Sequence, residues 1–141
     1  MADDRMDFVR SMSIATSGLR AQAGRMRVLS ENIANADSTA QTPGGDPYRR
    51  KVPTFSSTLD RALDARVVSL GRIRPDTSDF IVKHEPGNPA ADASGNVKYP
   101  NVNPLIEITD LRDAQRSYEA NLNIITATRR MIQRTLDILK A

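Results

Sequence analysis

Apolar residues recur at intervals of seven near both ends of the chain, with others three or four positions away. Near the N-terminus this series comprises Met12, Leu19, Met26 and Ile33, with Leu29 beside it. Near the C-terminus it comprises Leu111, Tyr118, Ile125, Ile132 and Leu139, with Leu122 and Leu136 beside it. Heptad spacing is typical of helices that pack along one apolar seam. The pattern predicts a mainly α fold in which two long terminal helices pair as an antiparallel, coiled-coil-like bundle.

Proline separates these two helical segments from the middle of the chain, because all eight prolines lie between Pro43 and Pro104. The same stretch is rich in glycine and in turn-forming dipeptides, with short strand candidates at residues 51–55, 66–70, 80–83 and 97–99. We therefore expect an N-terminal helix in residues 1–36, a loop-rich middle with a small irregular β component in 37–102, and a C-terminal helix in 103–141. Asn103 is the predicted N-cap of that last helix, with Pro104 at its first position.

The charge and the cysteine content exclude several classes of function. The chain carries a formal net charge of +3 and contains no cysteine. The positive excess is spread evenly along the chain, whereas nucleic-acid and membrane-surface binders concentrate it on one face or tail. The absence of cysteine excludes disulfides, thiolate metal sites and cysteine nucleophiles.

No catalytic arrangement emerges from the sequence. His84 is the sole histidine, and a hydrolytic triad with Asp79 or Glu85 has no support beyond proximity, so a solvated loop histidine is the preferred interpretation. Neither metal-ligand spacing nor a phosphate-binding glycine loop is present. We predict that the protein is not an enzyme, and no cofactor is implied.

One basic cluster, Arg49 to Lys51, admits two interpretations. It could bind phosphate, lipid head groups or an acidic partner, or it could be a solvated strand edge that discourages aggregation, which we prefer. The turn from Asn35 to Lys51 is long for a connection in a compact domain, so we expect it to be an interaction element. Tyr48, Arg49 and Arg50 would be its anchors, since tyrosine and arginine are enriched at interface hot spots.

Several short motifs resemble one protein family. Asn32-Ile33-Ala34-Asn35, preceded by Ser30, resembles the Asn-Leu/Ile-Ala-Asn signature of the bacterial flagellar rod, hook and hook-associated axial proteins. A Thr-x-Gly-Tyr/Phe-Lys element usually follows; here it is longer and includes Pro43, Gly44, Gly45, Asp46, Pro47, Tyr48, Arg49 and Arg50. That longer form resembles the proximal-rod members of the family. Residues 101–104 and 116–121 resemble the start and middle of the family's C-terminal helix.

The resemblance implies a structural subunit of the flagellar basal-body rod that polymerises through its terminal helices and transmits torque. It also implies other copies of the chain, other proximal and distal rod proteins, a rod-to-membrane-ring adaptor and the type III export apparatus as partners, with no nucleic acid or small-molecule substrate. The N-terminus lacks a basic stretch followed by an apolar run, so we expect export to the periplasmic rod without a cleaved signal peptide. The alternative is a free-standing helical adaptor or export chaperone.

Overall fold

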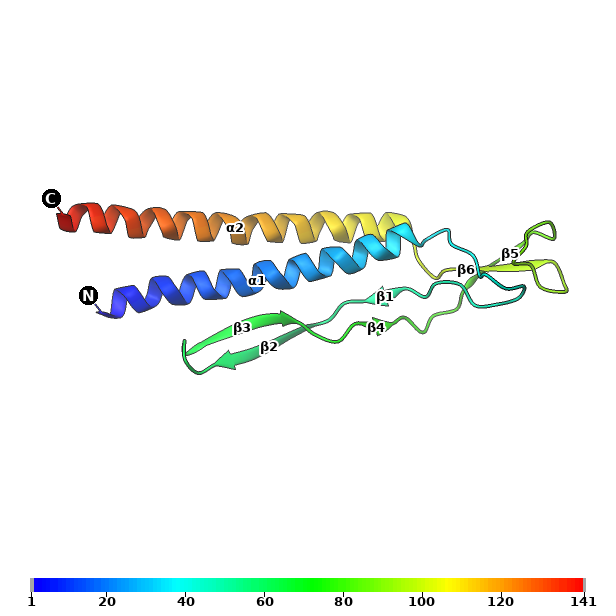
Figure 1. The fold of residues 1–141 in the computed structure, drawn as a ribbon, viewed down its shortest axis with the longest axis horizontal. Coiled ribbons are helices and arrows are strands. Elements are labelled where there is room, and N and C mark those ends of the chain that lie inside the picture. The colour runs from blue at the N-terminus through cyan, green and yellow to red at the C-terminus, as the bar shows by residue number, and fades with distance from the viewer. Residues whose placement is uncertain (1, 141) are drawn as a thin grey trace. The chain divides into compact units, whose positions relative to one another are not determined.

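Two long helices form about half of the structure, a computed structural model that describes residues 2–140 and side chains from Asp7 to Lys140. Helix α1 spans Ala2–Ala34 and helix α2 spans Pro104–Lys140. They pack side by side with opposite directions, so that the start of α1 and the end of α2 lie together (Figure 1). The predicted mainly α fold with an antiparallel helix pair is confirmed. Neither helix, over the residues described, has the length and apolarity that a membrane span needs.

The helix ends follow the local chemistry of the chain. The Asn103 side chain accepts a hydrogen bond from the Leu105 N–H at 3.1 Å, so it caps α2 as predicted, with Pro104 in the first position. Helix α1 ends two residues earlier than expected, because the Asn35 side-chain amide donates to the Glu31 carbonyl at 2.8 Å and the chain turns there. Residue 1 of the predicted N-terminal helix and residue 141 of the predicted C-terminal helix lie outside the described residues.

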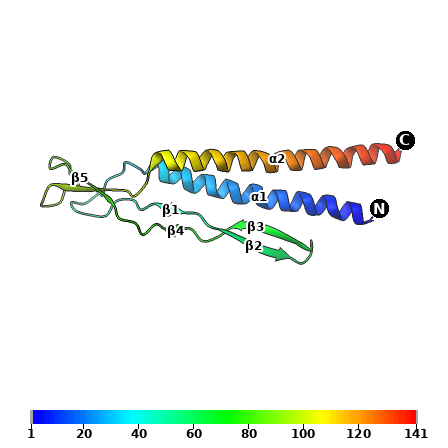
Figure 2. The ribbon, with the colours of Figure 1, turned by 180° about the vertical axis from the view of Figure 1, so that it is seen from behind.

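Between the helices, the described chain forms three antiparallel strand pairs (Figure 2). Strand β1 (Lys51–Val52) pairs with β4 (Arg74–Pro75), β2 (Phe55–Asp60) with β3 (Ala65–Leu70), and β5 (Ile81–His84) with β6 (Asn96–Tyr99). The strand expected at 51–55 is interrupted at Pro53, which has no N–H for a ladder. Strand β2 was not predicted, because its three central residues, two serines and a threonine, give no alternation of apolar and polar positions.

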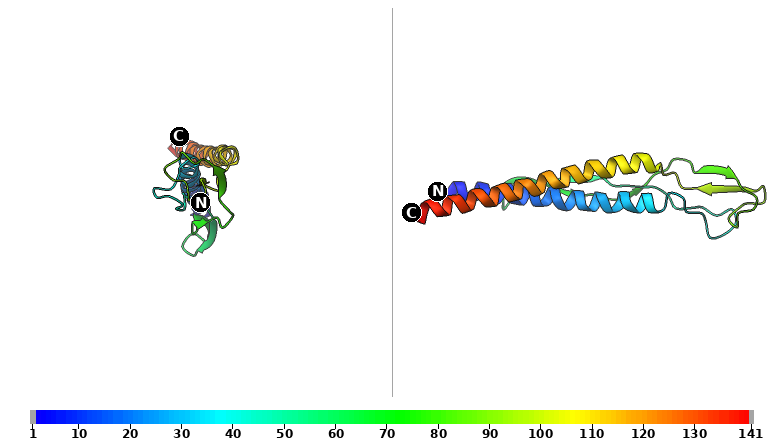
Figure 3. Two further views of the ribbon diagram at one scale, coloured as in Figure 1. Left: turned by 90° about the vertical axis from the view of Figure 1, so that its right-hand side faces the viewer. Right: turned by 90° about the horizontal axis from the view of Figure 1, so that it is seen from above.

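The chain forms two compact units, and each helix contributes to both. Unit 1 draws on residues 2–26, 54–72 and 113–140, and unit 2 on residues 27–53 and 73–112. Figure 3 shows the two helices from the end and from above. In unit 1 they approach closely at Gly18, where a Cβ would lie 2.9 Å from Asn121 Nδ2. The β2–β3 hairpin lies against α1, where Arg10 Nε donates to the Leu63 carbonyl at 2.8 Å.

Unit 2 contains the larger buried side chains. Its fully buried residues are Val28, Leu29, Asn32, Val97, Pro100 and Glu107. The first three come from α1, Glu107 comes from α2, and Val97 and Pro100 come from β6 and the residue after it. This unit therefore has a mixed core in which apolar side chains surround an amide and a carboxylate.

The predicted heptad residues are only partly covered within the chain. Leu29 is buried, and Leu122, Leu136 and Leu139 are exposed. The others are intermediate: Met12, Leu19, Met26, Ile33, Leu111, Tyr118, Ile125 and Ile132. The buried positions of α2 are instead Glu107, Ala114 and Thr128, a polar and small set separated by seven and fourteen residues. A subunit interface formed by the heptad residues stays a prediction.

Candidate functional site

Asn32, in the last turn of α1, is the centre of a buried polar network in unit 2. Its amide nitrogen donates to the Lys51 carbonyl at 2.8 Å and to Glu107 Oε2 at 2.9 Å. Its oxygen accepts from the Tyr48 hydroxyl at 2.8 Å and from the Lys51 N–H at 3.0 Å. All four hydrogen-bonding positions of the amide are therefore used. One side chain joins α1, α2 and the strand that follows the long loop.

Glu107, in the first turn of α2, is the charged partner in this network and is fully buried. Besides the bond from Asn32, its Oε1 accepts from Arg50 Nε at 2.6 Å. Arg50 also pairs with Asp76, with 3.2 Å between Nη1 and Oδ2. A buried carboxylate is costly unless it is paired and hydrogen-bonded, and here both conditions are met.

Arg49 and Asn101 extend the network over the backbone of residues 76–78. Arg49 Nη1 donates to the Asp76 carbonyl at 2.9 Å, and its guanidinium lies 4.1 Å from the centre of the Phe80 ring. The Asn101 oxygen accepts from the Arg50 N–H at 2.9 Å, and its amide nitrogen donates to Ser78 Oγ at 2.9 Å. These contacts fix the segment that carries β4 against the segment that carries β1.

The network shifts the ionisation of several of its members. Burial, followed by the charges of Glu31 and Glu107, raises the pKa of Tyr48 to about 12. Hydrogen bonds from the backbone and hydroxyl of Ser78, with the Arg50 guanidinium, lower the pKa of Asp76. Burial lowers the pKa of Arg50, but the bonds to Glu107 and Asp76 outweigh burial, so the pKa rises overall. The network thus favours neutral Tyr48, anionic Asp76 and cationic Arg50.

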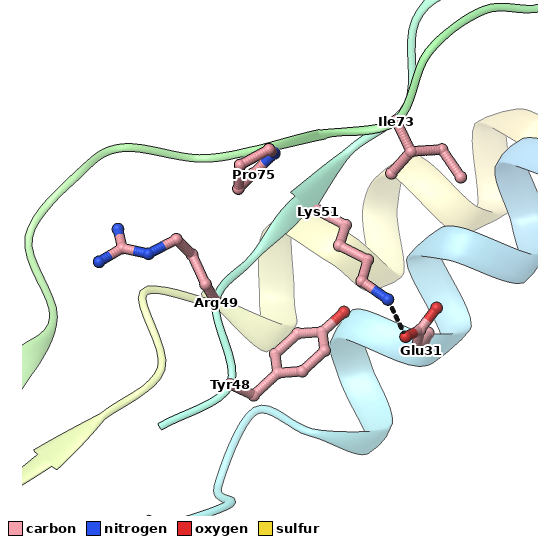
Figure 4. Close-up of a pocket in the computed structure, with 6 residues that line it drawn as sticks. All are labelled: Glu31, Tyr48, Arg49, Lys51, Ile73 and Pro75. Atoms are coloured by element: carbon pink, nitrogen blue, oxygen red, sulfur yellow. Dashed lines mark hydrogen bonds and ion pairs between the residues drawn. The ribbon is translucent and has the colours of Figure 1, made fainter. Parts of the chain in front are cut away.

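An open groove of about 600 Å³ adjoins the network (Figure 4). It is lined by Glu31, Tyr48, Arg49, Lys51, Ile73 and Pro75. Lys51 Nζ and Glu31 Oε1 form an ion pair beside the Tyr48 ring. Its lining contains no histidine, serine, threonine or cysteine. In the part of the chain that the structure describes, no three His, Cys, Asp or Glu residues are grouped to hold a metal ion.

The long loop that precedes Tyr48 contacts other segments of unit 2 through Gly44 and Asp46. Gly44 has a φ of 69°, the left-handed region that favours glycine, and its N–H donates to the Ala90 carbonyl at 3.1 Å. A Cβ on Gly45 would lie 2.6 Å from Thr42 Oγ1. Asp46 pairs with Lys98 at 2.8 Å. The chain turns sharply at the two glycines. The contacts of Gly44 with Ala90 and of Asp46 with Lys98 hold the turn in place.

The structure brings together only part of the predicted motif set. Asn32, Tyr48, Arg49 and Arg50 join the network, whereas Ile33 is half-buried and Ala34 is exposed. Asn35, Pro43, Gly44, Gly45, Asp46 and Pro47 shape the helix end and the loop outside it. The anchor residues Tyr48 and Arg50 have internal partners, so they hold their own subunit together whatever else they contact.

Sequence reasoning missed Glu107, Asp76 and Ser78 as members of the network. An acidic residue in the first turn of a helix is also favoured by the helix macrodipole, so Glu107 does not stand out in the sequence. A sequence signal existed, since Glu107 stands between Ile106 and Ile108 at the start of a heptad series, but nothing in the series identifies its partner. His84 lies exposed in β5 and not in a loop, with Nδ1 3.2 Å from Asn96 Oδ1.

Comparisons with known proteins agree on one family. Residues 12–40 match the family described as flagella basal body rod protein, and residues 93–138 match the family described as flagellar basal body rod FlgEFG protein C-terminal. The flagellar basal-body rod protein FlgC of Agrobacterium fabrum is 54% identical, over 91% of this chain and 92% of the relative. FlgC of Bacillus subtilis is 39% identical over 96% and 100%, and FlgC of Salmonella typhimurium is 35% identical over 94% and 98%.

Proposed function

The chain belongs to the FlgC family of flagellar basal-body rod proteins, and from this premise we propose that it polymerises through the apolar face that α2 leaves exposed. It is a structural subunit of the basal-body rod and assembles with other rod components. The resemblance read from the terminal motifs is confirmed, and the rod subunit is favoured over a free-standing adaptor or export chaperone.

The exposed apolar residues of α2 carry this proposal. They are Leu105, Ile106, Ile108, Leu122, Ile124, Met131, Leu136, Ile138 and Leu139. Leu105 is 73% exposed and Ile138 75%. Ile108, Leu122 and Leu136 form one line along the helix, and Ile124, Met131 and Ile138 form a second. Exposed apolar side chains in this number mark interaction sites in soluble proteins. Because the buried positions of α2 are small or polar, its aliphatic side chains remain available to other chains.

Burial of these side chains in the rod would supply the energy of assembly. Covering one exposed leucine or isoleucine is worth about 1.5–3 kcal/mol. Contacts between different patches on successive copies produce an open helical polymer, whereas contacts between identical patches close as a dimer. A rod of such subunits transmits torque through many parallel helix contacts, and nothing in this mechanism requires catalysis or a cofactor.

The position of the subunit is part of the same proposal. We place the subunit in the proximal rod, in the periplasm, because its loop from Thr42 to Lys51 resembles that of proximal-rod members. Its neighbours there would be distal rod proteins and a rod-to-membrane-ring adaptor. Export through the type III apparatus without a cleaved signal peptide, which the family resemblance implies, belongs to the same proposal. The half-buried Ile125 and Ile132 flank the exposed face and would be covered with it.

Substitution of a single exposed isoleucine tests the proposal. Ile124 is 49% exposed, so Ile124→Asp should leave the fold and the exported amount unchanged, yet abolish rods and swimming, because it places a charge in the contact. Ile125→Asp and Ile132→Asp should also abolish assembly. Asn123→Asp is the matched control, since it adds the same charge at a neighbouring exposed polar position. Normal rods in basal bodies carrying Ile124→Asp would overturn this use of α2.

A further inference from the structure

Strand β2 forms an open edge of the hairpin in unit 1. Its residues Phe55 to Leu59 are all exposed, and one of its sides pairs with β3. The N–H of Val68, in β3, donates to the Ser17 hydroxyl of α1 at 3.2 Å. The outer side of β3 therefore faces α1, and the outer side of β2 faces away from β3. No other strand among residues 2–140 pairs with that outer side.

The hydrogen bonds of the hairpin show which backbone groups point outward. Val68 lies opposite Ser57, and its N–H is directed at α1, so this is a pair without mutual ladder bonds. The Gly71 N–H bonds to the Thr54 carbonyl at 2.6 Å, which fits the same alternation. Phe55, Ser57 and Leu59 consequently present their N–H and C=O groups to the open side of β2.

This edge lacks the features that usually protect a free strand. The run from Phe55 to Leu59 contains no charge, proline or glycine. Phe55 is 45% exposed and Leu59 57%, and both lie on the same face as Ser57, since side chains alternate along a strand. The edge therefore offers backbone donors, backbone acceptors and two apolar side chains.

We propose that the open edge of β2 pairs with β2 of a second copy of this chain, antiparallel and centred on Ser57. In that register, Ser57 lies opposite Ser57 of the second copy and Phe55 lies opposite Leu59 of the second copy. The outward backbone groups then meet in hydrogen-bonded pairs, and two aromatic–aliphatic contacts form across the new strand pair.

Charge and proline positions favour this register over others. A parallel, in-register pairing would place Asp60 beside Asp60 of the second copy, and like charges directly opposite destabilise a sheet. An antiparallel shift by two residues would place Leu59 opposite Pro53 of the second copy, which has no N–H to donate. The register centred on Ser57 places Asp60 opposite Thr54, with neither defect.

The pairing is distinct from the contacts that build a rod. It joins the same patch on both copies, so it closes at two chains and does not propagate. It is a state of the subunit before assembly and does not depend on the proposed role of α2.

The oligomeric state of the full-length protein tests the proposal. We expect sedimentation to show a dimer. In Leu59→Lys, which places a charge on the edge, the dissociation constant should be at least about tenfold larger. Leu59 is exposed, so the far-ultraviolet circular dichroism should not change. Ile138→Lys makes a comparable change on the exposed face of α2 and should leave the dimer intact. A monomer at all concentrations, or a dimer indifferent to Leu59→Lys, would overturn the proposal.

Cysteine cross-linking tests the register, because the chain has no native cysteine. The opposed Ser57 residues would have Cα atoms about 5.5 Å apart, within the range that a disulfide spans. Mild oxidation should therefore link Ser57→Cys into dimers. Denaturing electrophoresis would detect the link. Ser69→Cys, in β3, should stay monomeric in the same assay. Equal cross-linking of the two variants, or none in Ser57→Cys, would exclude this register.

Discussion

The two units of the molecule differ in the size of the side chains that they bury. The largest fully buried side chains, among them Leu29, Val97 and Glu107, belong to unit 2. Over the described residues, unit 1 buries alanines and a threonine: Ala15, Ala21, Ala65, Ala114 and Thr128. Apolar burial is the dominant favourable term in folding, and alanine supplies little of it. Unit 2 therefore has a core of its own, and we expect unit 1 to depend on other chains for much of its stability.

The two units also differ in how well their buried polar groups are hydrogen-bonded. In unit 2, Asn32 uses all four of its hydrogen-bonding positions. In unit 1, Gln22 Oε1 is buried without a hydrogen-bond partner in the described structure. Buried polar groups in stable cores are nearly always bonded. A unit with small buried side chains and an unsatisfied acceptor is suited to rearrange when neighbouring subunits pack on it.

The largest difference should appear in amide hydrogen exchange of the dilute subunit. We expect residues 27–53 and 73–112 to exchange only through unfolding of their core, and residues 8–26 and 113–139 to exchange faster, through local opening. Local stability ranges from about zero to the full free energy of unfolding within one protein. Mass spectrometry of peptides on either side of Met26 and Asp113 would measure the contrast.

The same experiment on isolated rods is the control, because packed subunits should protect both units. Strong protection of residues 8–26 and 113–139 in the dilute subunit would contradict the comparison and indicate a self-sufficient helix pair. An intermediate pattern with a boundary elsewhere would place the autonomous core in a different part of the chain.

The next effect in size concerns the polar network. Arg50→Met removes the guanidinium from buried Glu107, and an uncompensated buried charge costs about 3–5 kcal/mol. Unit 2 should lose that much free energy of unfolding, as measured by urea denaturation. The loss should appear without any change in unit 1, because the network lies wholly in unit 2.

Arg74→Met is the matched control for this substitution. Arg74 is exposed in β4, so the same change there should alter stability by less than about 0.5 kcal/mol. If the two variants had equal stability, Glu107 would be stabilised by Asn32 alone and the ion pair would contribute nothing.

The sequence was sufficient for the parts of the fold that local patterns encode. The heptad series gave both helices, and Asn103 with Pro104 marked the start of α2 within one residue. The strand expected at 51–55 covers β1, whereas the two residues of β4 pair with a distant segment and leave no periodicity to detect. The exposed β2 has the same difficulty, because its polar composition resembles a loop.

The candidate site was only partly predictable for a related reason. Asn32, Tyr48 and Arg50 were found through their motif, but the motif does not state what they contact. Asn32 and Glu107 are 75 positions apart, and only packing of the two helices brings them together. The buried positions of α2 were also not predicted, because the heptad series consists of aliphatic residues and the helix instead buries Glu107, Ala114 and Thr128.

The smallest effect concerns the alkaline stability of unit 2. The pKa of Tyr48 is about 12 in the folded protein, above the ordinary value of 10.0. The unfolded chain therefore releases this proton first, so the contribution of Tyr48 is complete below pH 10 and is lost as the pH rises toward about 12. Tyr48→Phe removes that loss, and at neutral pH it costs about 1 kcal/mol for the bond to Asn32.

Urea denaturation at about pH 8 and about pH 11 would measure the effect in both proteins. The wild type should lose more stability between the two pH values than Tyr48→Phe does, because lysines and the other tyrosines titrate in both and their effects cancel in the difference. Tyr99→Phe is the control on the β5–β6 hairpin, where the hydrogen bond to Glu85 also raises the tyrosine pKa. A pH dependence that is identical in wild type and Tyr48→Phe would mean that Tyr48 is freely solvated. Asn32 would then hold the loop through Lys51 alone, and unit 2 would be less distinct from unit 1 than its buried network indicates.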